Sequence, residues 1–243
     1  MYKLHRNLTE KKLLIMKRIN LFLVMIFAMQ FGQNLIAQNK DTIVSELVDN
    51  IIMSRKTSSD LLPKYSWPSR TEILKSKEIL NIMIEKNQYD QQGKLIQKVL
   101  NEQGAKMPTA FLIKEIAETE KENMEKFLFG LRDFLKKYSL QETDQVKRFI
   151  AAAAWQVVDS THEFVFTGRN VEEKGDQLIW WVEDGHYSTA RIEVYTTFQE
   201  DVVHFTATFT RLRDGLNYLA YAEAHIPARN IILQIQNFDY MQE

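Results

Sequence analysis

Residues 189–226 read TARIEVYTTFQEDVVHFTATFTRLRDGLNYLAYAEAHI, and apolar and polar side chains alternate along much of this segment. A period of two residues is typical of a β-strand that buries one face and exposes the other. The dipeptide Asp214-Gly215 interrupts the alternation. Asp-Gly favours the tight hairpin turns that need positive φ angles. The segment therefore predicts antiparallel strands joined by short turns.

The same pattern continues on both sides of this segment. Further turns are expected at Asp184-Gly185 and at the polar clusters 172–176 and 199–201, because Gly, Asp and other small polar residues favour turns. We therefore predict that residues 160–243 form an antiparallel meander. Its strands are expected at residues 163–169, 177–183, 189–198, 202–212 and 216–226, with a possible sixth at 230–237.

Residues 38–159 show the spacing of helices instead. Apolar residues recur every three or four positions near the start of this region, which is typical of one face of a helix. They are Ile43, Leu47, Val48, Ile51 and Ile52. Two Ser-x-x-Glu sequences, Ser69 to Glu72 and Ser139 to Glu142, match the capping box at a helix start.

Two further helices complete this prediction. A short one is expected over 93–102, and a long one runs from Pro108, in its first turn, to Tyr138. We therefore predict an α+β fold in which a helical segment of about five helices, residues 38–159, packs on one face of the five- to six-stranded C-terminal sheet. The helices and the sheet are expected to form one compact unit.

The N-terminal residues 1–37 match a secretory signal peptide. Lys17 and Arg18 precede a short apolar run from Leu21 to Met29, and a small residue follows at Ala37. The apolar run is too short for a spanning helix, which needs about 20 residues. We expect export to the periplasm or exterior of a bacterium, with no stable membrane insertion after processing. An uncleaved anchor and a start at Met16 are alternatives.

Composition excludes several classes of function. The chain has no cysteine, which excludes redox chemistry at thiols. Removing residues 1–37 takes away six basic residues and one acid, which leaves 25 basic and 31 acidic residues and a net charge of −6. An acidic chain without a basic block is not expected to bind nucleic acid, whose recognition depends on neutralising phosphates.

One face of the predicted sheet carries two histidines. If Asp214-Gly215 is a two-residue turn, His204 faces His225 and Thr206 faces Glu223. A matching turn at residues 200–201 would put Thr197 on the other side of His204. Two histidines and a carboxylate are a ligand set for zinc or iron. The alternative is an ordinary solvated sheet face, because Thr, Tyr, Glu and Arg alternate on it.

The aromatic residues indicate where a ligand could lie. Trp180 and Trp181 point to opposite faces of one strand, and Tyr195 and Tyr221 share the polar face with the histidines. The opposite face combines large apolar residues with a row of alanines, which leaves room either for a pocket or for close approach of a helix. Our candidate ligand-binding residues are Trp180, Trp181, Tyr195 and Tyr221.

Catalytic motifs are absent from the sequence. It contains no phosphate-binding glycine loop, no G-x-S-x-G and no HExxH. We therefore expect an exported, non-enzymatic binding module without a cofactor, which binds a small apolar ligand or a protein partner. The alternative is a metal-dependent hydrolase that uses His204, His225 and Glu223. A third possibility is a structural or immunity-type protein that binds another chain and no small ligand.

Overall fold

The computed structural model describes residues 44–104 and 111–243. The chain divides into two units, Met1–Asp49 and Asn50–Glu243, whose boundary falls inside a helix over residues 44–61. Of the first unit only residues 44–49 are described, and they are helical. The predicted signal peptide, residues 1–37, lies outside the described residues.

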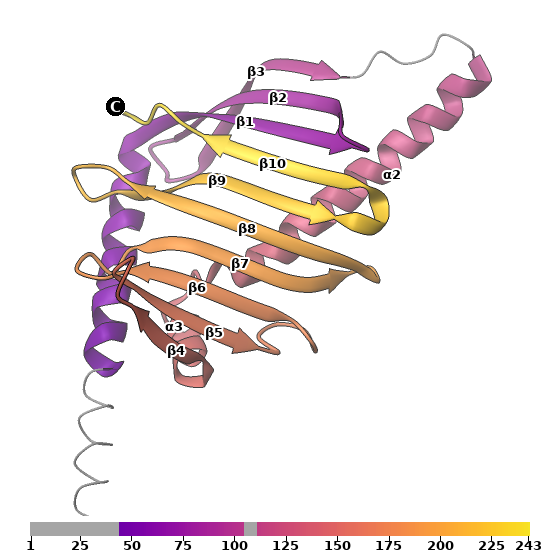
Figure 1. Ribbon diagram of the computed structural model, residues 1–243. Coiled ribbons are helices and arrows are strands. Elements are labelled where there is room, and N and C mark those ends of the chain that lie inside the picture. The colour runs from indigo at the N-terminus through magenta and orange to yellow at the C-terminus, as the bar shows by residue number, and fades with distance from the viewer. Residues whose placement is uncertain (1–43, 105–110) are drawn as a thin grey trace, which may run out of the picture. The chain divides into compact units, whose positions relative to one another are not determined.

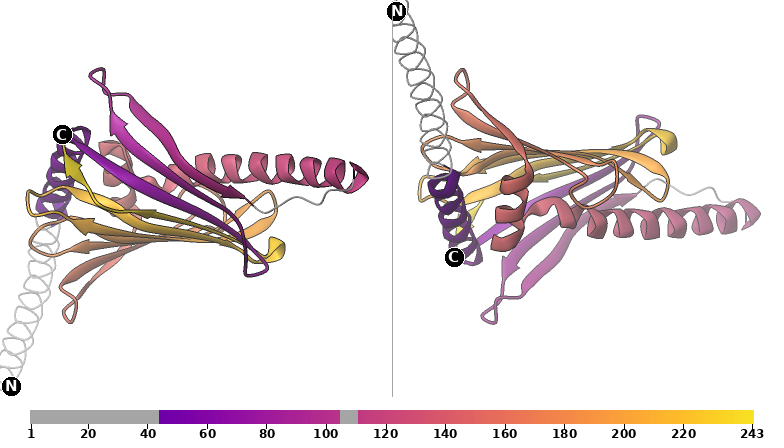
Figure 2. Two further views of the ribbon diagram at one scale, coloured as in Figure 1. Left: turned by 90° about the horizontal axis from the view of Figure 1, so that it is seen from above. Right: turned by 90° about the horizontal axis from the view of Figure 1, so that it is seen from below.

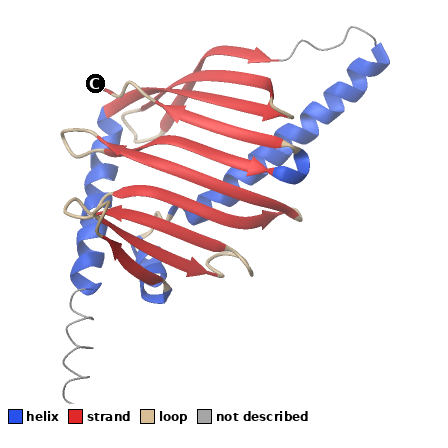
Figure 3. Cartoon of the chain, in the orientation of Figure 1, coloured by secondary structure: helices blue, strands red, loops and turns tan. Residues whose placement is uncertain are grey.

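The second unit is dominated by one antiparallel sheet of eleven strands among the described residues (Figures 1 and 3). Its order is β3-β2-β1-β10-β9-β8-β7-β6-β5-β4, and β11 pairs with β1. The strands are β1 (Tyr65–Lys75), β2 (Glu78–Tyr89), β3 (Leu95–Gly104), β4 (Ala154–Val158), β5 (Glu163–Arg169), β6 (Gln177–Glu183), β7 (Thr189–Phe198), β8 (Asp201–Arg211), β9 (Asn217–Ile226), β10 (Ile231–Asn237) and β11 (Met241–Gln242).

Helices in the second unit lie on one face of this sheet. Figures 1 and 2 show α2 (Phe111–Leu135) and α3 (Thr143–Ala152) on the same side, with α2 crossing behind the central strands. Three short 3₁₀ turns complete the unit: η1 (Leu62–Lys64), η2 (Lys136–Ser139) and η3 (Pro227–Arg229). Among the described residues, no helix is long and apolar enough to cross a membrane.

The predicted fold class is wrong in its proportions. The structure has a sheet of eleven strands in place of the expected five or six. The regions of the helices predicted from Ser69 and over 93–102 form β1, β2 and β3 instead, and the short strands β4 and β11 were not predicted. A two-residue turn at Ser76 and Lys77, with φ angles of 52° and 70°, joins β1 to β2. Neither residue is a glycine or an asparagine, so the sequence carries no turn signal there.

Pairing with the rest of the sheet selects the strand conformation of β1 and β2. The apolar residues of β2 fit both a helical and an alternating spacing, and tertiary contacts decide between the two. Each residue of β1 from Ser69 to Lys75 has a partner on β10. Gly93 has a φ of 77° in the turn between β2 and β3, where Asp90 accepts hydrogen bonds from the amides of Gln92 and Lys94.

The C-terminal strands lie close to their predicted positions. β5, β6 and β7 have the predicted bounds, β9 and β10 each differ by one residue at one end, and β8 differs by one residue at both ends. Strand β4 was missed, because α3 ends at Ala152 and the last of the four consecutive alanines, Ala154, already belongs to β4. The long predicted helix corresponds to α2 and η2.

Side chains of the helix-covered face form the core. Trp180, Phe166 and Leu178 of the sheet are fully buried, as are Leu131 of α2 and Leu140 after η2. The ring of Phe149 on α3 lies 6.1 Å from that of Trp180. Large aromatic side chains therefore join the helices to the sheet at the β5–β7 side.

Candidate functional site

An apolar cavity lies between the helices and the centre of the sheet. Its volume is about 380 Å³, which falls within the range of small-molecule pockets. Side chains of α2 and η2 form one wall, and strands β7 to β10 form the other. The apolar residues that line it are Leu135, Tyr138, Ile192, Phe205, Ala207, Phe209, Leu219, Ala222, Ala224, Leu233 and Ile235.

Three alanines create this space. Ala207 on β8 pairs with Ala222 on β9, and Phe205 pairs with Ala224. All three alanines are buried. Directly opposed small residues remove side-chain volume from the middle of the helix-covered face, while Ile192 and Ile235 continue the same row on either side. The sequence left open whether these alanines make room for a pocket or for close approach of a helix, and the cavity corresponds to the first alternative.

A buried carboxylate fixes the wall that α2 and η2 form. Asp176 accepts hydrogen bonds from the amides of Val171, Glu172 and Glu173 at 2.6–2.9 Å, and from the Tyr138 hydroxyl at 2.8 Å. Burial opposes the charged form, but these donors outweigh it, so the pKa of Asp176 lies below its usual value. Burial raises the pKa of the Tyr138 hydroxyl. Tyr138 therefore stays neutral and ties η2 to the sheet.

Cationic side chains stand at one side of the cavity. Arg55, Arg132 and Lys136 line it together with the polar Ser139 and Gln141. The guanidinium of Arg55 donates from Nη2 to the carbonyl of Ser139 at 3.0 Å and to that of Leu140 at 2.6 Å. Arg132, Lys136 and Gln141 are exposed, so the cavity reaches solvent on this side. Sequence reasoning missed these residues, because nothing in the helical pattern around Arg55 marks it as different from other surface cations.

The two tryptophans predicted to bind a ligand lie on different faces. Trp180 is fully buried on the helix-covered face, and its Nε1 donates to Thr189 Oγ1 at 3.1 Å. Arg55 lies 5.8 Å from its ring centroid. Trp181 lies on the opposite face, where the Arg191 guanidinium stacks 4.4 Å from its ring. Neither tryptophan is among the residues that line the cavity.

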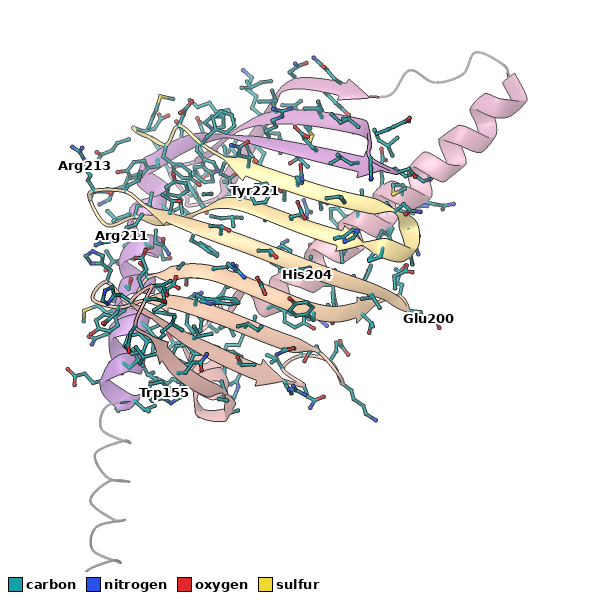
Figure 4. The ribbon with its side chains drawn as sticks, viewed as in Figure 1. Trp155, Glu200, His204, Arg211, Arg213 and Tyr221 are labelled. Carbon is teal, nitrogen blue, oxygen red and sulfur yellow. The ribbon has the colours of Figure 1, made fainter. Side chains whose placement is uncertain are left out.

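The other predicted residues gather on the polar face of the sheet. Figure 4 places His204 and Tyr221 on the central strands. His204 pairs with His225 as predicted, but its partner on β7 is Tyr195 and not Thr197. The turn between β7 and β8 uses Gln199 and Glu200, with φ angles of 50° and 69°. The register between β7 and β8 therefore moves by two residues, which leaves the side chains of these two strands on their predicted faces.

Two of the three predicted metal ligands, His204 and Glu223, contact neighbouring side chains on the polar face, although His204 Nε2 is buried without a hydrogen-bond partner. The Tyr195 ring stacks on His204 with centroids 4.4 Å apart. Glu223 accepts hydrogen bonds from the Tyr221 hydroxyl at 2.7 Å and from Gln234 at 2.9 Å. Within residues 44–104 and 111–243, no group of three or more His, Cys, Asp or Glu side chains is arranged to hold a metal ion. The metal site at His204, His225 and Glu223 therefore stays a prediction, and zinc binding by the purified protein tests it.

Comparisons with known proteins give only distant structural likenesses. No protein-family model matches the chain, and no curated protein matches it. A putative outer membrane lipoprotein-sorting protein domain from Vibrio parahaemolyticus aligns at 10% identity with a TM-score of 0.44, over 82% of this chain and 93% of that one. A DUF1329 family protein from Desulfovibrio piger aligns at 10% identity and 0.41, with the same coverage. A LolA superfamily protein from Nitrosomonas europaea aligns at 7% identity and 0.34, over 79% of this chain and 92% of that one.

Proposed function

We propose that this protein is an exported, non-enzymatic carrier that holds the hydrocarbon chain of a ligand in the cavity between α2, η2 and the sheet. The observation that supports this is the apolar cavity of about 380 Å³ in the second unit. Protein interiors are normally packed as densely as organic crystals, with few voids larger than a water molecule. A cavity of this size and lining therefore favours an apolar ligand.

The size of the cavity limits the ligand. If each non-hydrogen atom needs roughly the 30 Å³ of a liquid water, then about 380 Å³ holds roughly a dozen such atoms. This corresponds to one medium-length alkyl chain. Burial of each methylene contributes about 0.8 kcal/mol before the costs of association, so micromolar binding of a simple chain is reasonable.

Binding of a neutral fluorescent probe tests this function. 1-Aminonaphthalene is small enough for this volume, its emission shifts to the blue in apolar surroundings, and it is titrated into protein freed of lipid on a hydrophobic resin. We expect saturable binding to the wild type. The double variant Ala207→Leu with Ala222→Leu narrows the cavity and weakens binding by about tenfold or more, because the chain loses its contact area. Ala152→Leu on the exposed side of α3 is the matched control and binds as the wild type does.

Two results would contradict the carrier function. Absence of saturable probe binding to the lipid-free wild type would mean that the cavity does not accept apolar molecules. Equal binding to the wild type and the double leucine variant would mean that the probe binds elsewhere. In that second case the polar face with Tyr195, which is 42% exposed, becomes the surface to test with a protein partner.

A further inference from the structure

We propose that Arg55, with Arg132 and Lys136, binds the anionic head group of the ligand, so that the carrier takes a single-chain amphiphile with a carboxylate or phosphate head. This inference rests on the proposed function, because the hydrocarbon chain of the same ligand would fill the cavity. It specifies the charge of the ligand's head group, which the apolar lining alone does not determine.

Arg55 is a charge without a matching acid. It is half-buried, and burial lowers the pKa of its guanidinium, which means that its surroundings disfavour the charge. A guanidinium has five N–H donors, and its hydrogen bonds to Ser139 and Leu140 both use Nη2. Among the residues described in this structure, no carboxylate forms an ion pair with Arg55. A buried charge of this kind is costly unless an opposite charge joins it.

The other two cations share a single acid. Lys136 lies 2.9 Å and Arg132 3.9 Å from the same carboxylate oxygen of Asp133. Three positive charges on the cavity wall are therefore balanced by one nearby carboxylate, which leaves a local excess of two positive charges. This local excess contrasts with the acidic composition of the chain after residue 37. A concentration of one sign of charge at the opening of an apolar pocket attracts ligands of the opposite sign.

Glu223 also lines the cavity but does not neutralise these cations. Its carboxylate accepts hydrogen bonds from the side chains of Tyr221 and Gln234. The register places both of these residues on the polar face, together with His225. The carboxylate of Glu223 therefore points away from the cavity, and the side chains facing the opening are cationic or neutral.

The turn η2 brings the cations to the same place. Arg55 binds the carbonyls of Ser139 and Leu140 at its end, and Lys136 is its first residue. Ser139 Oγ also donates to the carbonyl of Lys136 at 2.6 Å. The apolar wall begins directly beside this turn with Leu135 and Tyr138. The cations therefore lie where the head group of an amphiphile would bind, and the apolar wall beside them lies where its hydrocarbon chain would bind.

Calorimetric titration of matched ligands tests the inference. Dodecanoate, dodecyl phosphate, dodecanol and dodecyltrimethylammonium have the same chain and differ in head-group charge. At neutral pH we expect both anions to bind the lipid-free wild type about tenfold or more tightly than dodecanol, because charge-assisted hydrogen bonds to arginine are strong. The cation should bind most weakly. Added salt should weaken binding of the anions and leave dodecanol unchanged.

Two variants separate the head group from the chain. Arg55→Met replaces the guanidinium with an apolar side chain of similar length, and we expect it to reduce the ratio of dodecanoate affinity to dodecanol affinity about tenfold. Arg132→Gln with Lys136→Gln changes two exposed side chains and is expected to fold as the wild type does. It should reduce dodecanoate affinity in the same direction by a smaller factor, since its charges are more solvated.

The outcomes distinguish this inference from the proposed function. Equal affinity of the wild type for dodecanoate and dodecanol would overturn the head-group site and leave the carrier function intact. An unchanged preference for anions in both variants would also overturn it. Failure of every ligand to bind the wild type would refute the carrier function itself.

Discussion

The substitution Ala222→Leu should stabilise the ligand-free protein. Leucine adds three carbon atoms, which at roughly 30 Å³ each occupy about a quarter of the cavity of about 380 Å³. Burying them contributes about 0.8 kcal/mol each, and fixing the leucine side chain costs about 0.5–1 kcal/mol. We therefore expect the free energy of unfolding to rise by about 1–2 kcal/mol. In a filled core, the same substitution would lower it by about 1–3 kcal/mol.

Unfolding in urea, monitored by tryptophan fluorescence, shows whether the substitution raises or lowers the free energy of unfolding. The lipid-free variant and wild type are compared by linear extrapolation, with the slope checked for constancy. Gly168→Ala is the matched control for a site without space, because its new Cβ would lie 2.5 Å from Phe149 Cε2. We expect that variant to lose about 1–3 kcal/mol. A loss of that size in Ala222→Leu, with an unchanged slope, would refute the presence of free space beside Ala222.

Two further predictions concern the supports of the site and its polar face. Asp176→Asn should lower the free energy of unfolding by about 2–4 kcal/mol, because the buried carboxylate that receives three amides and the Tyr138 hydroxyl is lost. Because the pKa of Asp176 is lower in the folded than in the unfolded protein, its contribution to stability is full above the unfolded value of about 3.9 and falls at lower pH. The difference in free energy of unfolding between wild type and variant, measured in urea, should therefore shrink below that pH. A difference that stays constant with pH would contradict this. The double variant His204→Ala, His225→Ala should change the free energy of unfolding by about 0.5 kcal/mol or less. Added zinc should change the melting temperature of neither the variant nor the wild type. A zinc-dependent rise in melting temperature confined to the wild type would support the metal site predicted from the sequence.

The sequence predicts the strands that carry strong turn signals and misses those that do not. Asp184-Gly185 and Asp214-Gly215 separate strands whose bounds agree with the structure within a residue or two. The β1–β2 turn places Ser76 and Lys77 in the left-handed region, which non-glycine residues adopt only when the surrounding sheet compensates. Without β10 as a visible partner, the apolar residues of β1 and β2 fit a helix as well as a strand.

The sequence indicated the apolar sheet face that lines the cavity, but it did not indicate the residues of the candidate site. The four predicted ligand-binding residues are not among those that line the cavity: Trp180, Trp181, Tyr195 and Tyr221. The charged residues of the cavity were not predicted either. We predicted the pairing of Ala207 with Ala222 from a two-residue turn at Asp214-Gly215. In the structure the turn is longer, since Arg211 pairs with Asn217, and a bulge between Thr208 and Phe209 restores the predicted pairing. Arg55 lies far along the chain from Ser139 and Leu140, whose carbonyls it binds. Such contacts depend on how a helix packs across the sheet, which local spacing does not specify.

The carrier function is tested most directly by native mass spectrometry of the protein purified from its own compartment without detergent. The denatured mass reports whether residues 1–37 have been removed, and the native mass reports what remains bound. We predict one bound amphiphile per chain, with an anionic head group in the extracted ligand, and loss of this extra mass in the Ala207→Leu, Ala222→Leu double variant. A native mass equal to the bare chain, or a bound molecule retained by the double variant, would contradict the account.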